Sequence, residues 1–227
     1  MTLGSLAAGG TLGILIPPSI SMIIYGALAE ASIGKLFAGG IIPGIVLSGM
    51  FMAYIGLRVR RNPRLAPKEA AISVRGLILG LKGLWPILIL MTIVLGGIFG
   101  GVMTPTEAAA AGSSAALAIA LGLRRFTWQM LKESLLSSLE TTCMLMFIVV
   151  GASILSSYLA VMGVPKLFAM FVFGSGLPAV GILLLIYLLY IFLGCFIDGL
   201  SAMILTLPTV LPILTTLGFD LIWFGVV

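Results

Sequence analysis

The chain has 227 residues, of which 61% are hydrophobic and 8% are charged, and its formal net charge is +5. Soluble domains carry roughly 25% charged residues, so this composition excludes a water-soluble fold. The chain contains no histidine, which excludes imidazole catalysis, and Cys143 and Cys195 lie in apolar runs without metal-ligand spacing. It also has no Walker, GxSxG or zinc motif. We therefore expect neither an enzyme nor a resident cofactor.

Long uncharged stretches predict an all-α, polytopic membrane protein, because a spanning helix needs about 20 apolar residues. Glycine and proline, both abundant, are tolerated in such helices. The elements expected in chain order are a broken helix or re-entrant segment (Met1–Gly26), a span containing Pro43 (Leu36–Leu57), a pair of spans (Gly83–Gly101 and Thr106–Leu123), a long span (Leu135–Met162), a short amphipathic interface helix (Lys166–Phe173), a span (Pro178–Phe196) and a segment interrupted by Pro208 and Pro212 (Ile197–Leu217).

Basic residues gather in two loops, Arg58–Lys82 and Arg124–Lys132. Short loops rich in lysine and arginine stay in the cytoplasm, so both loops are predicted there, and the Thr104–Glu107 link is predicted on the opposite side. We interpret Arg58–Lys82 as a topology signal rather than a binding site, and we expect no nucleic-acid partner. The N-terminus lacks the basic region of a signal peptide. Both ends lie in apolar sequence, so we expect the chain to be part of a longer subunit.

The first candidate site is the run Gly9–Ser19, which contains three glycines followed by Pro17 and Pro18. Each proline removes a backbone donor and clashes with the preceding turn, so the helix must break. The carbonyls that the break releases need new partners, and in secondary transporters a bound cation is one such partner. The alternative interpretation is a proline kink without a ligand.

The second candidate is Gly194–Ser201, where Asp198 is the only charged residue between Lys166 and Asp220. A carboxylate inside a membrane is costly, which makes it a functional-site hypothesis. Asp198 either contacts an ion or holds a hairpin together by accepting backbone N–H bonds, and we favour the second role. The alternative is a water-exposed tip where Asp-Gly makes a turn.

Three further patterns have structural interpretations. Thr104-Pro105-Thr106-Glu107 predicts a capping box at a helix start. Gly40 and Gly44 have the spacing of close helix contacts, which we assign to packing inside one subunit. Aromatic residues near the predicted span ends, Tyr187 among them, are interpreted as interface anchors.

The chain resembles a known family in several motifs, taken in order. They are Gly13-Ile14-Leu15-Ile16-Pro17-Pro18-Ser19, Ile33–Phe37, Gly40–Gly44, Gly97–Phe99, Thr104–Ala110, Phe196-Ile197-Asp198, Thr206-Leu207-Pro208 and Leu211-Pro212. These are similar to the large membrane (permease) subunit of tripartite ATP-independent periplasmic (TRAP) transporters. The resemblance covers nearly the whole chain.

The resemblance implies a Na⁺-coupled importer of organic acid anions, such as C4-dicarboxylates or sialic acid, with an elevator mechanism. It implies a multi-pass protein of the bacterial or archaeal inner (plasma) membrane. Its expected partners are a periplasmic binding protein, a small four-span membrane subunit and membrane lipid. Ion and substrate contacts are implied at Thr11, Gly13, Ile14, Pro17, Pro18, Ser19, Gly194, Asp198, Gly199 and Ser201.

The family has two inverted repeats, each with a re-entrant hairpin and a broken helix. Residues 1–57 resemble the end of the first repeat, 58–82 a cytoplasmic basic linker, and 83–227 most of the second. Thr11–Ser19 resembles the first broken-helix loop and Gly194–Ser201 the second hairpin, so each expected Na⁺ site keeps one of its halves here. Two other functions stay open: a stand-alone Na⁺/dicarboxylate-type elevator symporter, and a membrane scaffold without transport activity.

Overall fold

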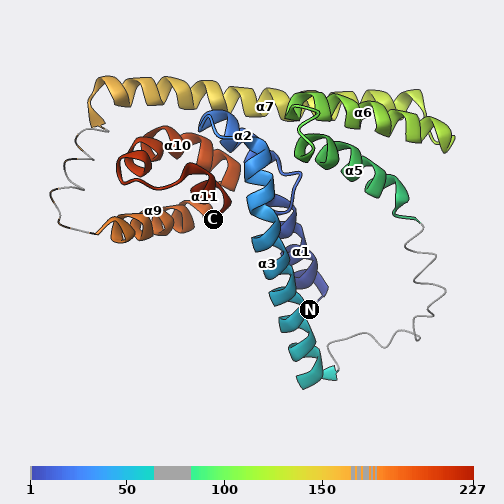
Figure 1. Ribbon diagram of the computed structural model, residues 1–227, viewed down its shortest axis with the longest axis horizontal. Helices are drawn as coiled ribbons and strands as arrows, with labels where there is room; N and C mark the ends of the chain where they lie inside the picture. The colour runs from blue at the N-terminus through green and yellow to red at the C-terminus, as the bar shows by residue number, and fades with distance from the viewer. Residues whose placement is uncertain are drawn as a thin grey trace. The chain divides into compact units, whose positions relative to one another are not determined.

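The computed structural model describes residues 2–63, 83–164, 167, 170, 174, 176 and 178–227 (Figure 1). Every element assigned in these ranges is a helix, which confirms the predicted all-α class. Of the predicted linker 58–82, residues 58–61 belong to a helix and residues 64–82 lie outside the described residues, as does most of the predicted interface helix Lys166–Phe173. The helices are α1 (Thr2–Leu15), α2 (Ile20–Leu28), α3 (Ile33–Arg61), α5 (Trp85–Phe99), α6 (Pro105–Gly122), α7 (Trp128–Val161), α9 (Ala179–Gly194), α10 (Gly199–Thr216) and α11 (Leu221–Val226).

Several of these helices have the length and composition of membrane spans. Among the described residues, four segments qualify: Ala8–Leu28, α3, α7 and α10. Helices α5 and α9 are also apolar but have 15 and 16 residues, fewer than a usual span. On α7, Phe147 and Val161 are 85% and 88% exposed. A soluble protein rarely exposes apolar surface on this scale, so lipid is the expected surrounding of this helix.

The chain divides into two compact units. Unit 1 comprises Met1–Met22 and Ile33–Trp128, and unit 2 comprises Ile23–Ser32 and Gln129–Val227. The boundary between the units therefore falls inside α2. This division groups residues by contact and differs from the predicted division into inverted repeats, which stays a prediction.

In unit 1, α1 packs along α3, and two glycines of α3 allow the close approach (Figure 1). A Cβ atom added to Gly40 would lie 2.9 Å from the backbone oxygen of Leu15 and 2.6 Å from the terminal methyl of Met22. One added to Gly44 would lie 2.8 Å from the Ile16 side chain. Small residues at this spacing let two backbones meet. Both glycines therefore serve packing inside the subunit, as predicted.

Also in unit 1, α5 and α6 pack together and are joined by a short link. The link turns at Gly101, whose φ of 67° suits glycine. Thr104 then caps α6: its backbone N–H donates to the Glu107 carboxylate over 2.7 Å, its hydroxyl donates to the same oxygen over 2.8 Å, and the Glu107 N–H donates to that hydroxyl over 3.4 Å. This confirms the predicted capping box.

In unit 2, α9 packs on α10, and α10 is one uninterrupted helix. The predicted interruption at Pro208 and Pro212 is therefore wrong. The buried residues of α10 explain why: from Ile204 to Ile213 they recur every three positions, so packing of one face offsets the missing proline N–H bonds. They include Ile204, Leu207, Val210 and Leu214. Near its C-terminal end the Thr216 hydroxyl also donates to the Pro212 carbonyl over 2.6 Å.

Helix α7 has 34 residues and begins at Trp128, seven residues before the predicted start. Its first turns are polar, and the Gln129 side chain donates to Glu133 over 2.9 Å. The predicted span Leu135–Met162 covered only the apolar part of this helix. A helix continues past that part when its polar turns lie outside the hydrocarbon core, which is about 30 Å thick against about 50 Å for a helix of this length.

The glycine contacts of α3 give a test with a built-in control. Gly40→Ala is expected to lower the free energy of unfolding by about 1–3 kcal/mol, because the added methyl would lie 2.9 Å from the Leu15 backbone oxygen, which shifts less easily than a side chain. Gly49→Ala, in the same helix with nothing within 4 Å of the added methyl, should be neutral or stabilising. Thermal unfolding of the full-length protein in detergent measures both. Equal effects of the two substitutions would contradict the role assigned to Gly40.

Candidate functional site

In unit 1 the helix break occupies Ile16–Ser19, between the end of α1 at Leu15 and the start of α2 at Ile20. The Pro17–Pro18 peptide bond is cis. Pro17 is buried and Ser19 is only 1% exposed, whereas Pro18 is exposed. The break is therefore packed into the unit rather than presented as a surface loop, and Gly40 and Gly44 of α3 make room for it.

The two prolines change the hydrogen bonding of the last turn of α1. Pro17 and Pro18 have no N–H, so the carbonyls of Gly13 and Ile14 lose the donors that a continuous helix would supply. The Ser19 hydroxyl donates to the Ile14 carbonyl and replaces one of them. No side-chain donor to the Gly13 carbonyl occurs among the hydrogen bonds described for this unit. Gly13 is an exposed residue, so its carbonyl can bond water or a cation.

The break is shorter than the sequence predicted. Thr11, Gly13 and Ile14 lie within α1 and are exposed, and the Thr11 hydroxyl donates to the Ala8 carbonyl over 2.8 Å as in an ordinary helix. The predicted loop Thr11–Ser19 is therefore corrected to Ile16–Ser19. The reason is that each proline removes one N–H donor, which would have bonded the carbonyl four residues earlier. The hydrogen bonds before that position remain, and the glycines do not break the helix. The proposed ion or substrate contacts of these residues stay predictions.

In unit 2 the second candidate forms a tip between α9, which ends at Gly194, and α10, which begins at Gly199. Asp198 is the N-cap of α10: the Ser201 N–H donates to Asp198 Oδ2 over 3.2 Å, and the Ser201 hydroxyl lies 3.4 Å from the same oxygen. The carboxylate thus caps the start of α10, and its predicted role toward an ion stays a prediction. Asp198 and Gly199 are exposed. Among the described residues, no three His, Cys, Asp or Glu side chains gather as a metal site would require.

Unit 2 also contains an aromatic cluster that the sequence interpretation missed. The Tyr25 hydroxyl donates to the Leu221 carbonyl over 2.6 Å, and Thr206 donates to the Tyr190 hydroxyl over 2.7 Å. Tyr187 stacks on Phe224 with ring centroids 6.0 Å apart, and its buried hydroxyl has no partner in the part of unit 2 that is described. Tyr187 is therefore a packing residue inside the unit, and the interpretation of it as an interface anchor is wrong.

This cluster surrounds a cavity of about 270 Å³ whose lining includes Gly199, the first residue of α10. The cavity therefore lies beside the start of α10, which Asp198 caps. The spacing of Tyr187 and Tyr190, one helical turn apart on α9, was the signal available in the sequence.

The hydroxyl of Ser19 can be tested by its removal. Ser19→Ala is expected to lower the free energy of unfolding by about 1–3 kcal/mol, because the Ile14 carbonyl loses its donor in a buried break. Ser48→Ala is the matched control, since the Ser48 hydroxyl donates to the Gly44 carbonyl within α3, whose regular helix supplies backbone donors. Thermal unfolding in detergent should show a loss only for Ser19→Ala. Equal stability of both variants would contradict the assignment.

The sequence is similar to known proteins along nearly its whole length. Residues 2–227 match the family described as "Tripartite ATP-independent periplasmic transporter, DctM component". A C4-dicarboxylate TRAP transporter large permease protein from Pseudomonas aeruginosa is 37% identical over 99% of the chain, which covers 52% of that protein. A sialic acid large permease protein from Vibrio cholerae is 36% identical over 98% of the chain, which covers 52% of it. An isethionate permease protein from Oleidesulfovibrio alaskensis is 33% identical over 97% of the chain, which covers 35% of it.

The comparison with these relatives establishes how much of a whole protein the chain represents and which family it belongs to. The chain spans about half the length of the C4-dicarboxylate and sialic acid relatives. Together with its apolar helices, the match makes it a multi-pass protein of the inner membrane. Because the match covers nearly every residue, the chain belongs to the DctM family of TRAP transporter membrane components.

Proposed function

We propose that this chain is part of the large membrane subunit of a Na⁺-coupled secondary transporter that imports small organic anions by an elevator mechanism. The observation that carries the proposal is the break at Ile16–Ser19, where two prolines end α1 and leave the carbonyl of the exposed residue Gly13 without its helical donor. A scaffold helix has no need of such a costly feature.

The break suits a monovalent cation. Backbone carbonyls of unwound helices coordinate Na⁺ in secondary transporters. The break contains no charged side chain, so transported Na⁺ would be held by neutral oxygens. Carbonyl oxygens are hard ligands, and they suit such an ion better than a transition metal.

The substrate class follows from the relatives together with the tip at Asp198. The names of the relatives mention C4-dicarboxylates, sialic acid and isethionate, all of which are small organic anions. Half-helix N-termini, such as the start of α10 beside this tip, favour anionic groups. A binding protein in the periplasm and a small membrane subunit complete the proposed complex. No ATP-binding partner is part of the proposal.

Transport in proteoliposomes tests the coupling and the partner together. The full-length protein, reconstituted with its small subunit, is expected to take up an organic acid only with a Na⁺ gradient and only when the binding protein is added. Uptake at full rate without a binding protein would instead identify a stand-alone symporter. Unchanged uptake when Na⁺ is replaced by K⁺ would contradict the proposed coupling.

Substitution of Asp198 separates its capping role from direct ion contact. Asn caps helices about as well as Asp, so Asp198→Asn should keep transport within about twofold, whereas Asp198→Ala loses the cap and should lower it about fivefold. Asp220 is the matched control, because it caps α11 in the same way with a 2.8 Å bond from the Trp223 N–H. Asp220→Asn is expected to leave transport and its Na⁺ dependence unchanged.

The alternatives predict other outcomes. If the Asp198 carboxylate bound Na⁺ directly, Asp198→Asn would reduce the apparent Na⁺ affinity as strongly as Asp198→Ala. If the protein were a scaffold, both Asp198→Ala and Pro17→Ala would leave transport untouched and alter only stability or assembly.

A further inference from the structure

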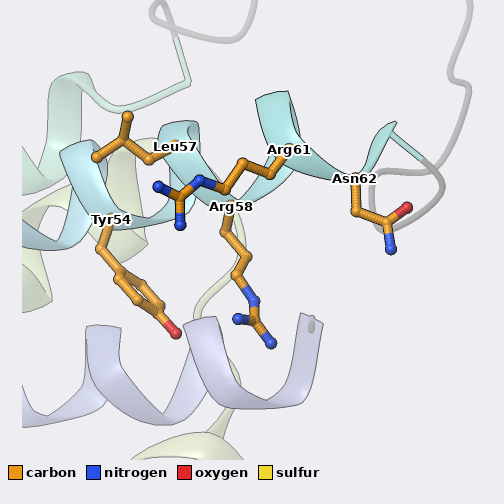
Figure 2. Close-up of a pocket in the computed structure, with 5 residues that line it drawn as sticks. All are labelled: Tyr54, Leu57, Arg58, Arg61 and Asn62. Atoms are coloured by element: carbon orange, nitrogen blue, oxygen red, sulfur yellow. The ribbon is translucent and has the colours of Figure 1, made fainter.

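The C-terminal end of α3 carries a cavity of about 430 Å³ that the proposed transport mechanism does not use (Figure 2). Its lining residues are Tyr54, Leu57, Arg58, Arg61 and Asn62. Positions 54, 58 and 61 are separated by four and three residues, so they share one face of the helix. Figure 2 shows Tyr54 and Arg58 extending to the same side, while the Arg61 side chain runs back along the helix toward Leu57.

The cavity lining is positively charged, and no acidic side chain among the lining residues balances that charge. Two of the five residues are arginines and none is acidic. In the described ranges of unit 1, which are 2–22, 33–63 and 83–128, the only acid is Glu107, and its carboxylate accepts the hydrogen bonds from Thr104 at the start of α6. An anion is therefore the ligand that the cavity lining favours.

The position of the cavity along α3 indicates how deep in the membrane it lies. This helix has 29 residues and qualifies as a membrane span, with basic residues only in its first and last turns. Tyr54 and Leu57 are 61% and 59% exposed just before those last charges. Exposed aromatic and apolar side chains followed at once by arginines mark the boundary between hydrocarbon and lipid headgroups.

We propose that this cavity binds the headgroup phosphate of an anionic glycerophospholipid. The guanidinium groups of Arg58 and Arg61 donate paired hydrogen bonds to the phosphodiester oxygens, a geometry that arginine forms better than lysine. The Tyr54 hydroxyl lies where it adds a further donor, and the Leu57 side chain and Tyr54 ring contact the first acyl carbons. A zwitterionic lipid brings its own ammonium group, so the arginines favour a lipid with net negative charge.

The test uses the full-length protein in detergent micelles, with phosphatidylglycerol added as the probe. Phosphatidylglycerol is expected to raise the unfolding temperature and to be retained in native mass spectra, whereas phosphatidylcholine is not. Each single variant, Arg58→Gln or Arg61→Gln, should weaken the apparent affinity about fivefold, and the double variant about 25-fold. Five basic residues of the Arg58–Lys82 segment remain in the double variant, so its membrane orientation is preserved.

Arg60→Gln is the matched control. Arg60 lies in the same turn and contributes the same charge, but it does not line the cavity. Its substitution should change the phosphatidylglycerol affinity by less than about twofold. Equal weakening by Arg60→Gln and Arg58→Gln would show diffuse charge attraction and overturn the site. So would equal stabilisation by phosphatidylcholine, or equal stabilisation by inorganic phosphate alone, which would indicate a free-anion site.

Discussion

A backbone carbonyl inside a bilayer has no water to bond, so it must find its donor within the protein or in a bound ion. Most of this chain meets that constraint with helices. At the break after α1 the double proline removes the donors of the Gly13 and Ile14 carbonyls. Ser19 restores one of them with its hydroxyl, and the other stays without a side-chain donor in the described part of unit 1. A backbone oxygen without a side-chain donor at a helix break is a structural cost inside a bilayer, and a transported cation can offset it, which is why we propose the coupling ion at this place.

The same constraint explains where the few polar side chains lie. Thr104, Asp198 and Asp220 each cap the start of a helix by accepting a hydrogen bond from the N–H three residues later. Capping supplies acceptors to N–H groups that have no partner within the helix. Close packing needs the opposite property, the absence of a side chain, and Gly40 and Gly44 supply it where α3 meets the broken end of α1. Polar side chains at helix ends and missing side chains at contacts together allow an apolar chain to contain a break.

Features set by neighbouring residues, such as helix breaks and caps, could be predicted from the sequence. Features that depend on packing between distant segments could not. The break at Pro17–Pro18, the capping box at Thr104 and the tip at Asp198 follow from missing donors and capping preferences, which act within four residues. The continuity of α10 through Pro208 and Pro212 was missed, because it depends on the buried face that α10 packs on α9. The cluster of Tyr25, Tyr187 and Tyr190 was missed for a similar reason. The hydrogen bond from the Tyr25 hydroxyl to the Leu221 carbonyl joins residues 196 positions apart, and a periodic sequence pattern cannot predict a contact over that separation.

The arginines at the end of α3 show how one feature of sequence can support two functions. Arginines that fix the orientation of a span must lie just outside the hydrocarbon, and that is also the depth of the lipid phosphates. Charge alone does not separate the two roles, because Arg58, Arg60 and Arg61 count equally as a topology signal. Geometry separates them. Arg58 and Arg61 share a helix face with Tyr54 and line a cavity, whereas Arg60 does not. Lipid recognition therefore adds to the orientation signal through side-chain placement, without any further charge.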